Sequence, residues 1–510
     1  MDAEKMAIKT KVYRSSRNLG TWLSPLAAAA ALTLAGCVNY AGIKSDHQIE
    51  PPAKYETQQS LPTEGGQWPS LDWSEQFGDP QLPKLIDEAL KDNPDIDEAR
   101  ARVDKAASYA GSAKSTLYPN ASASYSWQRN LYSENTIYPS PIGGSWESEN
   151  TLLTGASWDL DFWGKNHQKL KGAISDANVS EAEMEEVRIT LATSVATTYN
   201  ELARLYVLRD IAVNELKNRQ DIEQITNGRV HAGLDTNVER ETANGDTATI
   251  RSSVTSLDGQ ITTVRYQLAA LLGAGPDRGL AIAVPTLGAG AAVSLPDNLP
   301  ADLISRRPDL VAAYWQVDSA AHGVKEAKAE FFPDINLSAS LSLDAFGWGR
   351  FLTAGSRQIQ AGPAIHLPIF DAGALRSQLK GRYADFDYDV ANYNKTLVNA
   401  LSEVATQVTL IRSTDKQLVD AQAALDAQTK AYQLAAVRYR SGLNEQLQVL
   451  NADDNRLAAD QAVANLQMDR RNQQIALIKA LGGGFDATKT DLATQSGTPD
   501  TTLSALHPNR

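Results

Sequence analysis

The sequence predicts a membrane protein of mixed α and β structure that is built from two copies of one architecture. Three observations support this fold class. The chain of 510 residues repeats itself, it contains stretches in which apolar and small polar residues alternate, and it contains two long proline-free stretches with helical periodicity. Outside the N-terminal region no apolar run is long enough for a transmembrane helix, so strands must make any membrane crossing.

The duplication is visible in the spacing of corresponding residues. Gly442 lies 209 residues after Gly233 (442 − 233), and Arg307-Pro-Asp309 follows Asn93-Pro-Asp95 by 214 residues (307 − 93). The offset of 209 also relates three further pairs, Gly164 with Gly373, Val195 with Val404, and Leu272 with Leu481. An offset that holds over so long a stretch indicates two structural copies.

The N-terminus has the pattern of a secretory signal followed by a lipidation site. Basic residues within 5–17 precede an apolar segment at 23–34, and Leu34-Ala-Gly-Cys37 resembles a bacterial lipobox. We expect Cys37, the single cysteine of the chain, to be acylated; the alternative is a cysteine buried in the core. Val38, which is not acidic, favours sorting to the outer membrane.

These observations divide the chain into six segments. We expect a signal peptide at 1–36, starting at Met1 or Met6, a lipid-anchored linker at 37–67, a first repeat at 68–273, a connecting segment at 274–299, a second repeat at 300–483 and a flexible tail at 484–510. The linker and the tail are polar and contain proline, which disfavours a packed core.

Four stretches alternate apolar and polar residues and are predicted to be strands of about ten residues, the length that crosses a bilayer. They lie at 121–127 and 156–162 in the first repeat, within about 121–163, and at 335–343 and 359–369 in the second, within about 335–370. At 335–343 we expect Leu337, Ala339 and Leu341 to face lipid, and Ser338, Ser340 and Ser342 to face water. The alternative is the half-buried edge of a soluble β-sandwich.

Four strands cannot close a barrel, because an open edge in lipid leaves backbone groups without hydrogen bonds. The strands must therefore be pooled among identical protomers. Two protomers would give eight strands with a filled interior, and three would give twelve strands with room for a channel. The residues alone do not choose between these numbers.

Two long helices follow the strand pairs. Residues 165–227 and 374–439 have apolar residues three or four positions apart, and each is expected to reach roughly 95 Å. Shorter partner helices are expected at 235–272 and 445–481. The pattern indicates a thin helical wall that is wet on at least one side. Without the strands it would equally fit a lipid-anchored periplasmic coiled-coil protein with a structural role.

We find no pattern of a catalytic, metal or cofactor site. The six histidines lie far apart, no zinc-ligand spacing occurs, and Gly288-Ala-Gly290 lacks the third glycine of a dinucleotide loop. Asp453 and Asp454 are adjacent on a predicted helix and diverge by about 100°, so a solvated face is their default. The formal net charge of −13 argues against nucleic acid as a partner. We therefore expect neither an enzyme nor a cofactor.

Several motifs in order resemble the TolC-like outer-membrane factors, in their lipoprotein branch. They are Phe77-Gly-Asp-Pro-Gln-Leu82, Leu85-Ile-Asp-Glu-Ala-Leu90, Asn93-Pro-Asp95, Arg306-Arg-Pro-Asp-Leu310 and Ala327-Lys-Ala-Glu-Phe-Phe-Pro-Asp-Ile335. The resemblance covers nearly the whole mature chain. Tyr314-Trp315 departs from the commoner continuation of the fourth motif.

The resemblance implies a homotrimer with a twelve-stranded outer-membrane β-barrel, four strands per protomer, continued by a long periplasmic α-helical barrel. Such a protein is the passive outer-membrane duct of a tripartite efflux system that exports drugs or other toxic small molecules. A periplasmic adaptor protein and an inner-membrane transporter of unspecified class would be its partners. The sequence does not identify the exported substrate.

The resemblance also assigns roles to residues near the helix reversals. The tips that would contact the adaptor lie at 229–236 and 438–444, with the named contacts Arg229, Gly233, Leu234, Thr236, Arg438, Gly442 and Leu443. The periplasmic gate would involve Tyr439, Arg440, Asn451, Asp453 and Asp454. Asn451 stands where the family has a constricting aspartate, so either Asp453 or Asp454 is left to replace the acidic ring. We expect closure by contacts around Tyr439 rather than by a ring at position 451.

Overall fold

The structure is a computed structural model that describes residues 39–62, 64–135, 137–290, 294–296, 299–443 and 445–489. The expected signal peptide, Cys37 and nearly all of the expected C-terminal tail lie outside these residues. The chain forms two compact units, and each unit combines segments from both copies. The first unit consists of 1–43, 117–165 and 325–382, and the second of 44–116, 166–324 and 383–510. No helix among the described residues is long and apolar enough to cross a membrane.

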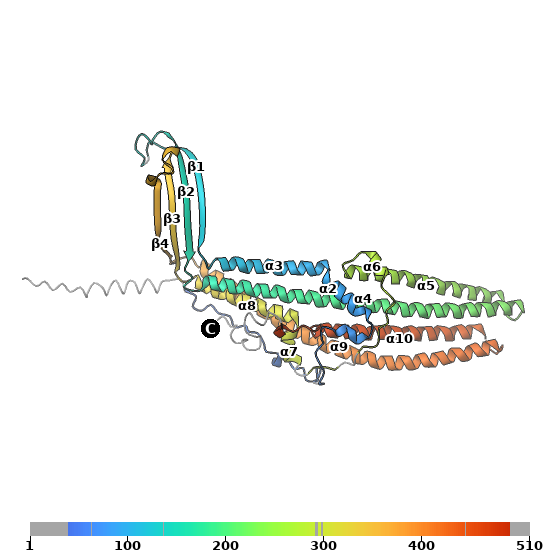
Figure 1. The fold of residues 1–510 in the computed structure, drawn as a ribbon. Helices are drawn as coiled ribbons and strands as arrows, with labels where there is room; N and C mark the ends of the chain where they lie inside the picture. The colour runs from blue at the N-terminus through green and yellow to red at the C-terminus, as the bar shows by residue number, and fades with distance from the viewer. Residues whose placement is uncertain are drawn as a thin grey trace, which may run out of the picture. The chain divides into compact units, whose positions relative to one another are not determined.

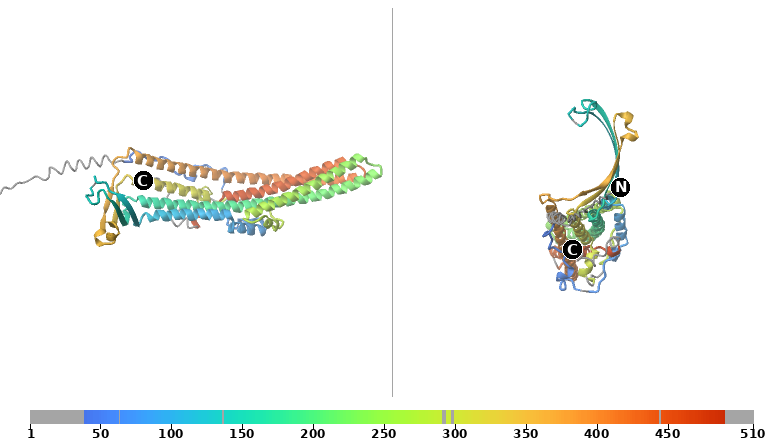
Figure 2. Two further views of the ribbon diagram at one scale, coloured as in Figure 1. Left: turned by 90° about the horizontal axis from the view of Figure 1, so that it is seen from above. Right: turned by 90° about the vertical axis from the view of Figure 1, so that its left-hand side faces the viewer.

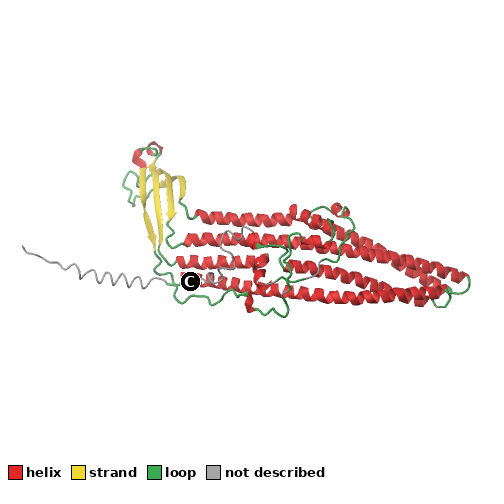
Figure 3. Ribbon diagram, turned by 60° about the horizontal axis from the view of Figure 1, so that its bottom comes forward, coloured by secondary structure: helices red, strands yellow, loops and turns green. Residues whose placement is uncertain are grey.

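The first unit contains one antiparallel sheet with the strand order β1-β2-β3-β4 (Figures 1 and 3). Its strands are β1 (Asn120–Leu131), β2 (Trp146–Asp159), β3 (Asp334–Phe346) and β4 (Arg357–His366). All four predicted strands are therefore present, two from each copy. The two outer strands, β1 and β4, each pair with a neighbour on one side only within the described chain.

The predicted alternation of faces along β3 is confirmed by its register. Leu341 pairs with Ile359 of β4, and Ser340 pairs with Gln360, so an apolar pair and a polar pair alternate. Leu337 and Leu341 are 43% and 48% exposed, as expected of side chains on an outer face.

Two strands end earlier than the alternation predicts. β2 ends at Asp159 rather than at residue 162, because the chain turns at Gly164, whose φ of 77° suits glycine. β4 ends at His366 rather than at residue 369, since Pro368 has no amide hydrogen to donate to a neighbouring strand.

The helices form two hairpins, whose bounds are close to those predicted, and several shorter segments. The bounds are α2 (Gln81–Lys91), α3 (Pro94–Ser115), α4 (Lys165–His231), α5 (Asn237–Leu271), α6 (Pro276–Leu280), α7 (Leu299–Arg306), α8 (Pro308–Ala329), α9 (Ala374–Arg440) and α10 (Gln446–Ala480). Helices α4 and α5 make the first hairpin and α9 and α10 the second (Figure 1). The hairpins lie side by side at the end where their chains reverse (Figure 2).

In both copies a side chain before a shorter helix forms a hydrogen bond to the end of the hairpin. Asn93, before α3, donates a side-chain hydrogen bond of 2.8 Å to the carbonyl of Leu271 at the end of α5. Arg307, before α8, donates one of 2.9 Å to the carbonyl of Ala480 at the end of α10. The C-terminal carbonyls of a helix have no partner within the helix, so each bond satisfies a group that needs one. The duplicated Asn-Pro-Asp and Arg-Pro-Asp motifs thus have a structural role.

An apolar core of the second unit surrounds the middle of α4. It is formed by buried side chains of α2, α4, α5 and α10, among them Leu82, Val195, Tyr199, Leu268 and Ile475. The hydroxyl of Tyr199 donates a hydrogen bond of 2.8 Å to Asp79, so its single polar atom has a partner inside the core. This core fixes the shorter helices on the longer ones.

The described part of the predicted linker is bound at several points. In the first unit Arg376 donates to the carbonyls of Asn39 and Ala41, and the ring of Tyr40 lies 5.5 Å from that of Phe331. In the second unit Asn394 accepts from the amide of Glu50 and donates to the carbonyl of Gln48, at 2.9 and 3.1 Å. Residues 39–50 are therefore held by helix α9 instead of forming a free tether.

Candidate functional site

Both helix reversals have the geometry that their glycines predict. Gly233 and Gly442 have φ angles of 72° and 73°, a region that side chains with a Cβ atom rarely adopt. In each tip the amide after the glycine donates to the carbonyl five residues earlier, from Leu234 to Arg229 and from Leu443 to Arg438, both at 2.9 Å. Leu234 and Leu443 are 67% and 71% exposed, so both predicted tip leucines project into solvent.

Each tip leucine has an exposed apolar neighbour that the sequence analysis does not single out. Val238 in the first turn of α5 and Leu447 in the first turn of α10 are both largely exposed. They lie four residues after the tip leucines and correspond to each other at the offset of 209 (447 − 238). Each tip therefore presents two apolar side chains, which is an unusual exposure for a folded surface and typical of a binding site.

The first tip is closed by its own polar residues. Arg229 donates two hydrogen bonds to the carboxylate of Asp235, at 2.7 and 3.0 Å, and this contact lowers the pKa of Asp235. Thr236 and Glu239 form a capping box at the start of α5. Thr236, predicted as a contact residue, thus also has a structural role.

Tyr439 lies between the two hairpins and is 2% exposed. The guanidinium of Arg229 stands 4.9 Å from the centre of its ring. Its hydroxyl lies 3.4 Å from the side-chain oxygens of both Thr226 and Asp235. The expected contact network around Tyr439 therefore exists within one protomer, although its cation is Arg229 and not Arg440, which is exposed. Burial raises the pKa of the Tyr439 hydroxyl, which stays protonated at neutral pH.

A small apolar layer continues from Tyr439 towards the middle of the hairpins. Ile222 of α4, Val449 and Leu450 of α10, and Tyr439 of α9 form one buried cluster. Gln446 donates a hydrogen bond of 3.0 Å to Thr226 at the edge of this layer. The layer joins three helices from both copies, so the two hairpins are packed together near their tips.

Behind the apolar layer lies a buried ionic cluster. Glu215 of α4 accepts from Arg219 at 2.6 Å and from Arg456 of α10 at 2.8 Å. Arg456 also donates to Asp453 at 2.8 Å, and Arg219 contacts Asp454. Glu215 and Asp453 are both fully buried. The solvated face expected for the aspartate pair is therefore wrong for Asp453, because Glu215 and Arg219 of α4 lie against it.

The cluster holds more carboxylates than guanidinium groups. Besides the two arginines it contains Glu215, Asp453 and Asp454, and one oxygen of Asp453 accepts no hydrogen bond from the described residues. Burial, and then the neighbouring Asp453, raise the pKa of Glu215 to about 7. Protonation of Glu215 lowers the negative charge of the cluster at mildly acidic pH.

The structure separates the predicted gate residues into two groups. Tyr439, Asp453 and Asp454 contact residues of the other hairpin, whereas Arg440 and Asn451 are exposed. Sequence reasoning does not single out Glu215, Arg219 or Arg456. The sequence does contain a signal for two ion pairs within helices. Glu215 and Arg219 are spaced i to i+4, and Asp453 and Arg456 are spaced i to i+3. That signal does not show that the two pairs meet.

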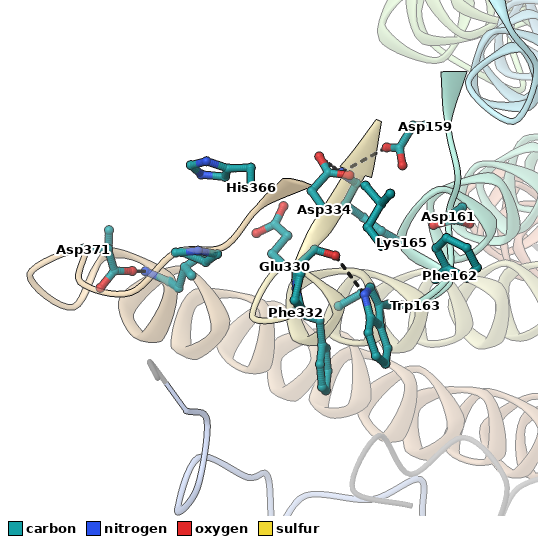
Figure 4. Close-up of a pocket in the computed structure, with 16 residues that line it drawn as sticks. Asp159, Asp161, Phe162, Trp163, Lys165, Glu330, Phe332, Asp334, His366 and Asp371 are labelled. Atoms are coloured by element: carbon teal, nitrogen blue, oxygen red, sulfur yellow. Dashed lines mark hydrogen bonds and ion pairs between the residues drawn. The ribbon is translucent and has the colours of Figure 1, made fainter. Parts of the chain in front are cut away.

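A pocket of about 350 Å³ lies in the first unit, where β2, β3 and β4 meet the starts of α4 and α9 (Figure 4). Lys165 lies between Asp159 and Asp334, with its nitrogen 3.4 and 3.6 Å from their oxygens. Trp163 stacks on Phe332 and donates to the carbonyl of Pro333. These contacts join the strand ends to the first turn of α4, and none of the predicted site residues lines the pocket. Among the described residues no group of His, Cys, Asp or Glu is arranged to hold a metal ion.

The sequence pattern of the family described as outer membrane efflux protein matches residues 85–274 and 299–483. These two segments make up most of the chain and coincide with its two copies. The chain belongs to the outer membrane efflux protein family.

Similar proteins agree with this assignment. Fusaric acid resistance protein FusA of Burkholderia cepacia is 36% identical over 317 residues, which are 61% of this chain and 59% of that relative. Multidrug resistance outer membrane protein MdtQ of Escherichia coli O6:H1 is 30% identical over 471 residues, with 89% of this chain and 96% of that relative covered. The crystal structure of the outer membrane protein VceC of Vibrio cholerae superposes with a TM-score of 0.76 at 34% identity, covering 82% of this chain and all of VceC.

Family membership confirms the fold class and the general function. This outer membrane efflux protein is an outer-membrane export channel, and its family is one of transport ducts rather than enzymes. The alternative of a periplasmic structural protein is thereby excluded. Channels of this family are trimeric and work with adaptor proteins and inner-membrane transporters.

Proposed function

We propose that this chain is the outer-membrane duct of a tripartite export system and acts as a homotrimer. The observation that carries this proposal is the four-stranded sheet with one unpaired edge on β1 and one on β4. Three such sheets joined edge to edge give twelve strands and leave no open edge in lipid. The sheet is connected in each copy to a helical hairpin, which supplies the periplasmic part of the duct.

The two hairpin tips form the contact with a periplasmic adaptor protein, which in turn connects the duct to an inner-membrane transporter. The exposed pairs Leu234 with Val238 and Leu443 with Leu447 support this assignment. The names of the relatives, multidrug resistance and fusaric acid resistance, support toxic small molecules as the exported class. The transporter selects the substrate, and the duct carries it.

The channel is closed between the tips by the contacts around Tyr439. This residue is buried against Arg229 and Thr226 of the other hairpin, and the apolar layer of Ile222 and Leu450 lies directly behind it. Opening requires the hairpins to separate at this layer, which exposes apolar surface to water and therefore costs free energy.

Acylation of Cys37 fixes the N-terminus in the outer membrane, and the helical hairpins extend into the periplasm. The lipobox pattern before Cys37 supports the acylation. The binding of residues 39–41 by Arg376 supports a fixed position for the chain that follows the anchor.

The proposal is tested by purifying the protein from outer membranes in mild detergent. We expect heat-modifiable trimers with β-strand content, single-channel conductance in planar bilayers, and restored drug resistance in a host that lacks its own duct. A monomeric protein without conductance would contradict the proposal. A conducting trimer that restores no resistance with any adaptor would contradict the assigned partners.

A further inference from the structure

The two tips of one protomer are related by the duplication, so their corresponding residues can be compared directly. Arg229 corresponds to Arg438 at the offset of 209 (438 − 229), and the tip leucines correspond as well. The acidic partner of Arg229 does not correspond to an acid, because Asp235 is replaced by Asn444 (444 − 209). Both tips therefore have the arginine, but only the first tip has the carboxylate that pairs with it.

The first arginine is fully engaged inside the protein. Arg229 donates twice to Asp235 and covers the ring of Tyr439. Its side chain is 23% exposed, and that of Asp235 is 12% exposed. A partner protein that docks on this tip meets a neutral pair, so the first tip recognises apolar surface and shape rather than charge.

The second arginine has no such partner. Arg438 is exposed, as is Arg440 two residues later, and neither forms an ion pair within the described part of the chain. The exposed acidic residue of this tip is Glu445, at the start of α10, which leaves an excess of positive charge. Glu445 makes no side-chain cap, in contrast to Thr236 at the corresponding position of the first tip. Within the described part of the second tip, Arg438 thus has no acidic partner.

The free arginine lies beside the exposed apolar side chains of the same tip. The carbonyl of Arg438 accepts a hydrogen bond of 2.9 Å from the amide of Leu443, so both residues belong to one turn. Leu447 and Leu434, one turn further along α10 and before Arg438 on α9, are also more than half exposed. A guanidinium next to apolar surface is the combination that recognises a carboxylate next to an apolar residue.

We propose that the second tip provides the charge specificity of docking, because it binds a surface of a partner protein that presents a carboxylate beside an apolar side chain. Arg438 forms a bidentate ion pair with that carboxylate while Leu443 and Leu447 pack against the apolar residue. The first tip contributes apolar contact alone. This inference rests on the proposed docking of an adaptor at the tips and adds which chemistry that partner must carry. Charge complementarity of this kind accelerates association and excludes partners that carry a basic residue at the same place.

Reversal of the charge at Arg438 tests the proposal in cells whose drug resistance depends on this duct. Arg438→Glu is expected to reduce export roughly tenfold or more, whereas trimer yield and conductance in bilayers stay at the wild-type level. Lys430→Glu is the matched control, since Lys430 is exposed on the same helix and the change in charge is the same. It is expected to export normally. Unchanged export by Arg438→Glu, or an equal loss in both variants, would overturn the proposal.

A second variant uses the duplication itself. Asn444→Asp places in the second tip the acid that the first tip already has, and is expected to reduce export because Arg438 then pairs internally. Normal export by Asn444→Asp would contradict the proposal that docking requires Arg438 to be available to a partner. Trimer yield and bilayer conductance of Asn444→Asp are measured alongside export. Wild-type values of both show that a loss of export is not a failure to fold.

Suppressors of Arg438→Glu identify the partner. Selection for restored resistance is expected to yield replacement of an Asp or Glu by Lys or Arg on the surface of another periplasmic protein. Suppressors confined to this chain would mean that Arg438 pairs with a neighbouring protomer, and the proposal would then be wrong. If the wild-type protein forms no conducting trimer, the proposed function itself fails, and this outcome is separate from every result above.

Discussion

Tyr439 takes its cation from the other copy of the sequence. The neighbouring Arg440 is exposed, and the guanidinium over the ring belongs to Arg229, which reaches it across the contact between the hairpins. Arg229 is at the same time bound to Asp235, whose oxygen lies 3.4 Å from the Tyr439 hydroxyl. The three residues contact one another, so removal of the ring leaves the partly exposed guanidinium of Arg229 with less to pack against.

We expect Tyr439→Ala to raise single-channel conductance and to sensitise cells to large antibiotics. The change removes the largest side chain of the apolar layer, and substitutions of this kind cost about 3–5 kcal/mol of packing free energy. Arg440→Ser serves as the control because its side chain is exposed, and it is expected to leave conductance at the wild-type level. An open channel in Asp453→Ala together with a closed one in Tyr439→Ala would place the gate at the ionic cluster instead.

Glu215 is a residue whose charge state responds to pH near neutrality. It faces Arg219 of its own helix α4, Asp453 and Arg456 of α10, and Tyr432 of α9, whose ring lies 5.2 Å from the Arg456 guanidinium. Arg219 also forms ion pairs with Asp454 and with Asp246 of α5. Because its pKa is raised from 4.5 to about 7, the folded protein binds a proton that the unfolded chain releases. Glu215 therefore stabilises the fold at acidic pH, and this contribution is lost as the pH rises through 7.

We predict that thermal stability of the trimer falls between pH 5 and pH 8 and that Glu215→Gln weakens this dependence. The full contribution of a shift of this size is on the order of 3 kcal/mol per protomer. The measurement is the unfolding midpoint at a series of pH values. Asp221→Asn, an exposed change on the same helix, is expected to keep the wild-type dependence. An identical pH profile for Glu215→Gln and wild type would show that other groups carry the dependence.

At the scale of the element, the alternation of apolar and polar residues along β3 predicts both a strand and the surroundings of its two faces. From Ile335 to Leu341 the apolar side chains of β3 pair with apolar residues of β4, as Leu341 does with Ile359, and its serines alternate with them. Leu341 is 48% exposed within the chain, so lipid must cover it if the sheet is part of a membrane barrel. The serines on the opposite face then face water.

Arginine at Leu341 is expected to cost about 2–4 kcal/mol, because it places a charge in the lipid near the bilayer centre, and to lower the yield of trimers. Arginine at Ser340 is expected to be tolerated. Both variants are compared by the fraction of heat-modifiable trimer in outer membranes. Equal damage at the two positions would show that the two faces of β3 are exchanged or that the strand does not cross the membrane.

At the scale of the whole molecule, both copies contribute to every functional part. The sheet takes β1 and β2 from the first copy and β3 and β4 from the second. The apolar layer around Tyr439 combines α4 with α9 and α10, and the ionic cluster combines α4 with α10. Neither copy can form the duct by itself, because each would have a two-stranded sheet and a hairpin without its packing partner.

Cys37→Ser is predicted to abolish incorporation of radioactive palmitate without abolishing trimers. The sheet, and not the lipid, inserts the protein in the membrane, so conductance of the purified variant is expected to match the wild type. The control is a variant at Ser45, which lies after the lipobox and is expected to be labelled normally. Labelling of the Cys37→Ser protein would contradict the lipobox.

Much of the fold could be predicted from the sequence because its signals are local. Alternation along 335–343 specifies a strand and its faces, and Gly233 and Gly442 specify the reversals, since each depends only on neighbouring residues. The end of β4 was predicted three residues too late because the effect of Pro368 outweighed the alternation.

The sequence by itself determined the duplication, the strand and helix types, the glycine turns and the family to which the chain belongs. Tertiary structure alone decided what Asp453 and Tyr439 contact. Asp453 is buried because Glu215 and Arg219 approach it from a helix more than two hundred residues earlier, and Tyr439 is covered by Arg229 for the same reason. Burial and charge pairing depend on which surfaces meet in space. A periodic pattern indicates that a helix has an apolar side but does not state which residues it meets there.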